Sequence, residues 1–204
     1  MEAAQISAGD VKALRDRTGA GIMDAKSALQ ESGGDVDKAI EILRVKGQAS
    51  AAKRGGRQAA EGVVSSYIHA GGKIGVLVEI DCETDFVART EPFQDFAREV
   101  ALHVAAANPL YVSYDDVPEE DREAELRVLR EQAASEGKPE NVQEKIVQGR
   151  LNKWLEDVVL LNQTHINDEK HGGKTLEELR AELAANTGEN VVVRRFARFQ
   201  IGEE

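Results

Sequence analysis

A strand-like run, Ile74-Gly-Val-Leu-Val-Glu-Ile-Asp-Cys82, leads through Glu83 into the segment Thr84-Asp-Phe-Val87. Its apolar residues alternate, which places every second side chain on one face of a β-strand. Thr84 offers a side-chain oxygen where a helix could begin, and a carboxylate such as Asp85 is favoured in a first helical turn. This arrangement would carry Phe86 on the rim of the fold, although a large aromatic residue after a strand is more often buried. The run itself leaves both interpretations of Phe86 open.

The composition is that of a globular chain. The 204 residues suit one or two domains with a real core, and 41% hydrophobic with 31% charged residues indicates a folded protein. No apolar run approaches about 18 residues, so no membrane span is expected. The net charge of −11 argues against direct binding of nucleic acid, which needs clustered cations, and suits a protein partner.

Two features bear on the location of the chain. The single cysteine, Cys82, excludes an intramolecular disulfide and fits a reducing cytosol. The first residues, Met1 to Ile6, carry no apolar signal core. We therefore expect a cytoplasmic protein that makes no membrane contact.

The first fifty residues are predicted to form three short helices. Ser7 and Asp10 resemble a capping box ahead of the first helix, and Asp35 is the expected cap of the third. The expected helices run from Ser7 to Gly19, from about Ile22 to Ser32, and from Asp35 to Gly47. Helices this small bury little surface, so we interpret residues 1–50 as a module that presents an apolar patch to a partner.

The segment Gly21-Ile22-Met23 is the candidate contact patch of this module. It follows a glycine-containing turn and begins the second helix. Packing of Ile22 and Met23 between the helices is an equally open alternative.

Residues 51–61 are predicted to be a linker, and residues 62–204 an α+β core. The basic run from Lys53 to Arg57 could touch an acidic partner, but it is short and lacks interleaved aromatic residues. A solvated, partly helical linker is the stronger interpretation of this run.

The core is predicted to be one small antiparallel sheet with helices packed on it. A hairpin pairs Val63–His69 with Lys73–Asp81, and Val191 to Ile201 returns to the same sheet as the last strand. The expected helices run from about Pro92 to Ala107, from Pro118 to near Gly137, from Pro139 to about Leu161 with a possible break at Gly149, and onward from Thr175. This is an α+β layer architecture.

No arrangement in the sequence builds an active site. The end of a phosphate-binding loop is mimicked by Gly173-Lys174-Thr175, but Asp168 stands where the first glycine should be. His165 and His171 have no cysteine beside them, which argues against a zinc site, and His103 is expected to be a hydrogen-bonded core residue. We therefore expect no catalytic residue, no metal and no cofactor.

Two longer motifs point to a family. The N-terminal stretch Val11-Lys-Ala-Leu-Arg-Asp-Arg-Thr-Gly-Ala-Gly-Ile-Met-Asp-Ala-Lys-Ser-Ala-Leu29 resembles the N-terminal signature of bacterial elongation factor Ts. The stretch Ile80-Asp-Cys-Glu-Thr-Asp-Phe-Val87 resembles the second signature of that family. The hairpin around Tyr67 and the segment Arg195-Phe-Ala-Arg-Phe199 are also similar to family segments. The resemblance covers nearly the whole chain.

The resemblance implies a guanine nucleotide exchange factor for elongation factor Tu in translation elongation, and no enzyme. It implies that the N-terminal module has a ubiquitin-associated-like three-helix fold that grips the GTPase. It also implies that Asp85 and Phe86, flanked by Thr84 and Val87, insert into the nucleotide-binding domain and disturb the magnesium and phosphate site. A partner that weakens nucleotide binding is itself displaced when nucleotide rebinds.

The chain departs from longer family members, which carry two similar core halves. Only one half is present here, as in the short form of the family, which implies a homodimer and a two-plus-two complex with elongation factor Tu. An exposed sheet edge that needs a cover supports the dimer. Two other classes stay open on the sequence: a binding adaptor that uses the helical module, and an enzyme that uses Gly173-Lys174-Thr175.

Overall fold

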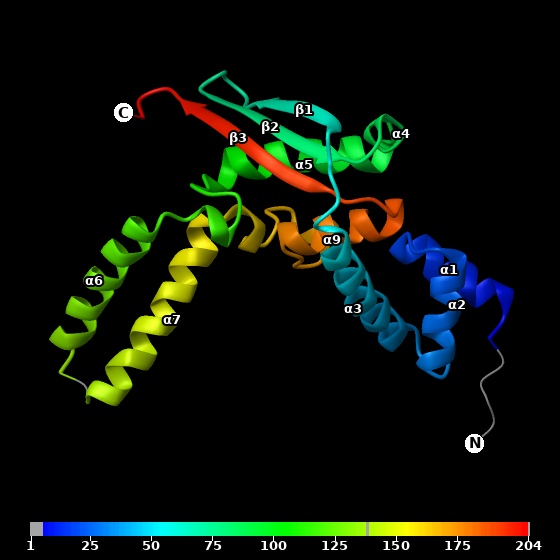
Figure 1. Cartoon of the computed structure of the whole chain (residues 1–204), viewed down its shortest axis with the longest axis horizontal. Coiled ribbons are helices and arrows are strands. Elements are labelled where there is room, and N and C mark those ends of the chain that lie inside the picture. The colour runs from blue at the N-terminus through cyan, green and yellow to red at the C-terminus, as the bar shows by residue number, and fades with distance from the viewer. Residues whose placement is uncertain (1–5, 138, 204) are drawn as a thin grey trace. The chain divides into compact units, whose positions relative to one another are not determined.

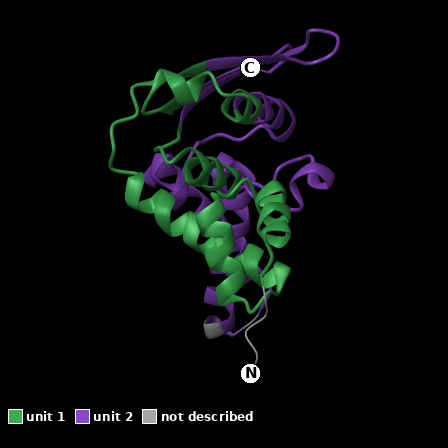
Figure 2. Ribbon diagram, turned by 90° about the vertical axis from the view of Figure 1, so that its right-hand side faces the viewer, with its two compact units in different colours: residues 1–63, 80–96, 178–192 green, residues 64–79, 97–177, 193–204 purple. Residues whose placement is uncertain are grey.

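The computed structural model describes residues 6–137 and 139–203. Residues 1–5, on which the expectation about a signal segment partly depends, lie outside the described residues. Figure 2 shows the two compact units of the chain, each built from separate segments. The first unit comprises residues 1–63, 80–96 and 178–192, and the second comprises residues 64–79, 97–177 and 193–204.

A three-stranded sheet confirms the predicted hairpin and the returning strand. The strands are β1 (Glu61–Ile68), β2 (Ile74–Cys82) and β3 (Val192–Gln200), in the order β1-β2-β3. The hairpin turn passes through Gly71 and Gly72, whose φ angles of 89° and 69° are ones that glycine adopts without strain. With helices over a small antiparallel sheet, the chain has the predicted α+β fold.

The core residues of β2 follow the predicted alternation. Val76, Val78 and Ile80 are buried, and Cys82 ends the same buried row. Helix α5 (Glu91–Ala107) lies along one face of the sheet (Figure 1). The predicted apolar stripe of this helix is also buried: Phe93, Phe96, Val100 and Val104.

Three helices form the N-terminal module, as predicted. They are α1 (Ala8–Thr18), α2 (Ile22–Glu31) and α3 (Val36–Arg54). Ser7 and Asp10 form the predicted capping box, and Asp35 caps α3 by accepting from the backbone N–H of Lys38. The module has its own small core, made of Val11, Leu14, Ala25, Ala28, Leu29 and Ala39.

The prediction that the third helix ends at Gly47 is wrong. Helix α3 continues to Arg54, and Ala51 within this extension is only 2% exposed. A Cβ atom at Gly47 would lie 3.5 Å from Cβ of Ala185 in helix α9 (Leu176–Thr187). The glycine therefore leaves room for a close helix contact, and the alanine-rich residues after it favour continued helix.

The second unit contains a helical hairpin, drawn in green and yellow in Figure 1. Helices α6 (Glu119–Ser135) and α7 (Glu140–Val158) pack through a core of Leu129, Ala133, Val147, Leu151, Leu155 and Val159. Gly149 does not break α7. In the first unit, the short helix α4 (Asp85–Ala88) lies in the chain between β2 and α5.

Three short elements were not predicted. They are the 3-10 turns Tyr114–Asp116 and Leu160–Asn162 and the one-turn helix α8 (Asp168–His171). The segment Gly173-Lys174-Thr175 lies between α8 and α9, with no strand before it, so it lacks the context of a phosphate-binding loop. Among the helices of the described residues, none combines the length and the apolar content needed to cross a membrane.

Candidate functional site

The segment Thr84–Val87 forms a capped helical turn at the end of β2. Thr84 is extended, with φ −133° and ψ 153°, and its side chain accepts a hydrogen bond from the backbone N–H of Val87. This is the predicted N-cap, and it starts the four-residue helix α4. Asp85 stands in the first turn and pairs with Arg89 at 2.8 Å. The turn therefore has a defined conformation before any partner arrives.

Phe86 points away from the core. Its side chain is 79% exposed, whereas Ala88 two residues later is buried. Of the two interpretations that the sequence left open, the structure supports the rim position. An isolated apolar ring held out on a capped turn contributes little to the fold, so it is available to a partner.

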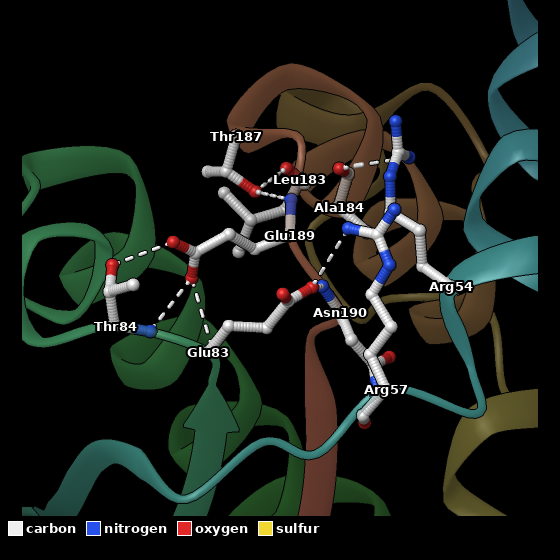
Figure 3. A network of polar contacts seen from close by, with 9 residues as sticks. All are labelled: Arg54, Arg57, Glu83, Thr84, Leu183, Ala184, Thr187, Glu189 and Asn190. Atoms are coloured by element: carbon white, nitrogen blue, oxygen red, sulfur yellow. Dashed lines mark hydrogen bonds and ion pairs between the residues drawn. The ribbon is translucent and has the colours of Figure 1, made fainter.

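The turn is tied to the connection between α9 and β3, as Figure 3 shows. The Glu189 carboxylate accepts from the backbone N–H of Glu83 at 3.0 Å and of Thr84 at 3.1 Å. The Thr84 hydroxyl donates to the same carboxylate at 2.6 Å. In return, the Glu83 carboxylate accepts from the backbone N–H of Asn190 at 2.7 Å. We call this exchange of hydrogen bonds the Glu83–Glu189 clasp.

The basic run that follows the module also takes part in this network. Arg57 donates to the Glu83 carboxylate at 3.4 Å, and its carbonyl accepts from the Asn190 side chain at 2.9 Å. Arg54 donates to the carbonyl of Ala184 at 3.4 Å. Two of the basic side chains are thus engaged within the chain, which favours a structural role for them over a contact with an acidic partner.

Cys82 lies beside the turn but is no nucleophile. Burial and the nearby Glu189 charge raise the pKa of the Cys82 thiol to about 11. The thiol donates to the carbonyl of Thr84 at 3.2 Å. A thiol that stays protonated near neutral pH is unreactive, so the site offers contact surface rather than covalent chemistry.

The candidate patch of the N-terminal module is on its surface. Ile22 is 59% and Met23 73% exposed, and neither belongs to the apolar core of the module. Gly21 is the extended residue before α2, with φ −60° and ψ 149°. The alternative of packing between the helices is therefore wrong. The patch and the Phe86 turn belong to one compact unit but to separate elements of it.

Known proteins resemble this chain over nearly its whole length. The model of the family described as elongation factor TS matches residues 3–172. The chain belongs to the elongation factor Ts family. It is 57% identical over 198 residues to elongation factor Ts of Caldanaerobacter subterraneus subsp. tengcongensis, a match that covers 97% of this chain and 98% of that protein. It is 58% identical over 193 residues to elongation factor Ts of Carboxydothermus hydrogenoformans, covering 95% and 88%.

Family membership confirms the resemblance found in the two sequence motifs. It also agrees with the interpretation of an exchange factor rather than a catalyst of a chemical reaction. The coverage shows that this chain and the matched elongation factor Ts protein are of similar length.

A histidine cluster in the second unit was only partly visible in the sequence. His165 and His171 lie with Glu99 so that one donor atom of each is within 4.8 Å of the others. The Nε2 atoms of His165 and His171 are 3.3 Å and 3.5 Å from Oε2 of Glu99, and Lys170 pairs with the other oxygen. Glu99 could not be linked to this cluster from the sequence, because it lies 66 residues before His165.

The hydrogen bonds of His165 argue against a metal on this cluster. Its Nδ1 accepts from the backbone N–H of Asn167 at 3.1 Å, so Nε2 carries the ring proton. A metal at Nε2 would need the opposite tautomer, with an N–H at Nδ1 facing the N–H of Asn167. In this member of the elongation factor Ts family, the cluster is better explained as a hydrogen-bonded network of the two rings with the Glu99 carboxylate and Lys170.

His103 is buried and hydrogen-bonded, as predicted, and it binds a backbone amide in the same way as His165. Its Nδ1 accepts from the backbone N–H of Ile166 at 3.2 Å, and its Nε2 lies 2.8 Å from Oε1 of Gln163. Two imidazoles thus hold consecutive backbone amides of the loop before α8. Protonation of either ring would place an N–H at Nδ1 opposite the backbone N–H that this nitrogen now accepts. The loop conformation therefore requires both histidines to be neutral.

We expect this elongation factor Ts family member to lose stability as the pH falls from 7 to 5.5. Burial, assisted by neighbouring charge, lowers the pKa of His103 and of His165. The unfolded chain then binds more protons than the folded chain below the ordinary histidine pKa of about 6.5. The contribution of these rings is therefore present above that pH and is lost below it. Melting temperatures at the two pH values measure the loss.

Other charged and titratable groups lie beside these two rings, so the test must change the rings and leave those groups in place. Glu99, Lys170 and His171 face His165, which itself faces His103. Burial alone would raise the pKa of Glu99, but its hydrogen bonds with Lys170 and His171 hold that pKa below its usual range. Glu99 therefore stays ionised between pH 5.5 and 7. A double change, His103→Gln with His165→Gln, should flatten the pH dependence, whereas His69→Gln on the exposed hairpin should not. An unaltered slope in the double variant would contradict the assignment.

Proposed function

We propose that this chain promotes GDP release from elongation factor Tu by inserting Asp85 and Phe86 between helices of the nucleotide-binding domain of that GTPase. The intrusion would disturb the magnesium and phosphate site, so that GDP leaves and GTP can enter. One observation carries the proposal: Phe86 is 79% exposed at the tip of a capped turn. Membership in the elongation factor Ts family supports the role of exchange factor, with elongation factor Tu as the partner.

The energetic basis is reciprocal coupling. A protein that weakens nucleotide binding by a given factor is itself bound more weakly, by the same factor, once nucleotide returns. Contacts suffice for this, and no catalytic group is needed. Phe86 supplies apolar bulk that is already presented to solvent, and Asp85 supplies a charge in a fixed first turn. The activity belongs in the cytoplasm and needs no direct contact with nucleic acid or a membrane.

Release of labelled GDP from purified elongation factor Tu tests the proposal. The chain at a small fraction of the GTPase concentration should accelerate release repeatedly, and excess GDP should dissociate the complex of the two proteins. Tight binding without acceleration would instead favour the adaptor alternative. The adaptor has no use for the exposed turn at Phe86.

We further propose that Gly21, Ile22 and Met23 form the grip of the N-terminal module on elongation factor Tu. Ile22 and Met23 are exposed and adjacent at the start of α2, outside the core of the module. Gly21 provides the extended entry that lets α2 begin at its neighbour. Exposed apolar side chains on a small module are typical of a binding surface.

The sheet of the second unit supports the proposal of a homodimer. Backbone bonds from His69 to Ile74 and from Ile201 to Lys73 set the register of the three strands. In that register one face carries a row of exposed apolar side chains: Val64, Ile68, Leu77, Phe199 and Ile201. Among the described residues no further strand pairs with β1 or β3 at the two edges of this sheet. A face of this kind is typical of an interface, and a two-plus-two complex with elongation factor Tu would follow.

The dimer predicts a solution mass of about twice the chain mass of 22.2 kDa. Leu77→Lys should halve that mass without unfolding the chain, because Leu77 is exposed in a single copy. Light scattering at micromolar concentration measures the mass of the wild-type chain and of the variant. Val128→Lys on α6 is the matched control. A wild-type mass of one chain would contradict the proposal.

A further inference from the structure

The carboxylate of Glu189 accepts three hydrogen bonds from Glu83 and Thr84, the two residues that lead into α4. Both of its oxygens are used, Oε2 by the backbone N–H groups of Glu83 and Thr84 and Oε1 by the Thr84 hydroxyl. The three donors come from two consecutive residues directly before Asp85. Glu189 itself lies 105 residues away in the connection between α9 and β3.

The hydroxyl of Thr84 links Glu189 to the helical turn. A hydroxyl has one proton and two acceptor lone pairs. Because the proton is donated to Glu189 at 2.6 Å, the lone pairs are left to accept from the backbone N–H of Val87. The carboxylate thus sets the orientation in which Thr84 caps α4.

A helix of four residues cannot hold its own conformation. The first turn of a helix fixes several residues for one hydrogen bond, so isolated turns are unstable in water. Helix α4 spans only Asp85–Ala88, and its side-chain cap is the Thr84 hydroxyl. The direction of Phe86 therefore depends on the bonds that hold Thr84.

We propose that Glu189 is a positioning residue for nucleotide exchange, which fixes the Thr84 cap and through it the direction of Phe86. This inference rests on the proposed function, since it concerns the same inserted pair. The Glu189 side chain acts on Phe86 indirectly, through the backbone N–H groups of Glu83 and Thr84 and the Thr84 hydroxyl.

Only a glutamate meets the geometry of these three donors. A glutamine has one acceptor oxygen for the two backbone N–H groups, and its NH2 group can only donate to the Thr84 hydroxyl, so the hydroxyl proton loses its charged acceptor. An aspartate is shorter by one methylene group. Glu189→Gln should therefore remove the charge-assisted bond that orients the Thr84 hydroxyl, while the backbone N–H of Asn190, which is bound by Glu83, keeps its partner.

The first test measures GDP release from elongation factor Tu at rising concentrations of Glu189→Gln. The maximal rate should fall by about tenfold, the size expected for loss of one charge-assisted hydrogen bond. The concentration for half-maximal rate should change little, because the patch at Ile22 and Met23 is untouched. Glu136→Gln is the matched control, since it makes the same charge change at a carboxylate that pairs with Arg150 and has no part in the Glu83–Glu189 clasp.

Substitutions of Thr84 give the second test and guard against a simple loss of folding. Thr84→Val should reproduce the effect of Glu189→Gln, and Thr84→Ser, which keeps the hydroxyl, should restore the rate. In a background of Phe86→Ala, the change at Glu189 should have no further effect, because residues that act through one contact are not additive. Melting temperatures of all variants are measured beside the rates.

The outcomes separate this inference from the proposed function. A full release rate in folded Glu189→Gln or folded Thr84→Val overturns the positioning role. So does an additive loss in the variant that combines Glu189→Gln with Phe86→Ala. A full rate in Phe86→Ala alone overturns the insertion mechanism instead. Slow Phe86→Ala with normal Glu189→Gln leaves the function standing and removes Glu189 from it.

Discussion

The double change Asp85→Ala with Phe86→Ala is expected to slow GDP release from elongation factor Tu by about thirtyfold or more, the equivalent of a 2 kcal/mol hot spot. The fold should survive the change. Phe86 is largely exposed, so its removal leaves no cavity, and surface substitutions usually shift stability by about 0.5 kcal/mol or less. The pair of Asp85 with Arg89 is also exposed, and such pairs contribute little.

A buried phenylalanine gives the contrast that interprets this result. Phe93 is 0% exposed in the same compact unit, and Phe93→Ala should cost about 3–5 kcal/mol of stability. That is a large share of the roughly 5–15 kcal/mol that holds a typical domain together. Leu110→Ala, at an exposed apolar residue of the second unit, is the control for loss of surface apolar area.

Thermal unfolding measured beside labelled GDP release separates three results. Slow release with near-native melting supports insertion of the pair. If the double variant melted at a temperature as low as that of Phe93→Ala, Phe86 would have to be a core residue, which would contradict its exposure. Normal release from a folded double variant would remove the pair from the mechanism.

Local signals predicted most of the fold because their partners are close in sequence. The capping box of Ser7 with Asp10, the cap at Thr84 and the alternation of β2 each depend on residues within a few positions. Gly47 misled the prediction, because a glycine that normally ends a helix here permits close contact with Ala185. That contact joins residues far apart in the chain, and no local pattern reports it.

The same limit applies to the candidate site. The motif around Phe86 was found from the sequence, but both exposure and the more common burial of an aromatic residue fitted the pattern, and the structure shows that the side chain is exposed. Glu189 and Glu99 were missed altogether, since each meets its partners across more than sixty residues. A single carboxylate among 37 acidic residues carries no signal of its own.

The second large effect is expected at the N-terminal module. Ile22→Ala with Met23→Ala should weaken the complex with nucleotide-free elongation factor Tu by about thirtyfold, if the two side chains act as one hot spot of about 2 kcal/mol. The melting temperature should stay near native. Both side chains are exposed, and alanine is a better helix former than isoleucine at the start of α2.

Changes at the Ile22–Met23 patch and at Phe86 should affect different kinetic quantities. This difference tests whether the patch provides binding and Phe86 provides exchange. Loss of the grip at Ile22 and Met23 should raise the concentration needed for half-maximal exchange while the rate at saturation stays close to native. Loss of Phe86 should lower the rate at saturation, because a bound factor that cannot intrude does not release GDP. Titrations of both variants and of the exposed control Val128→Ala measure the distinction. If the module variant bound with native affinity, the grip would have to lie elsewhere on the chain, and the exposed apolar patch at α2 would need another occupant.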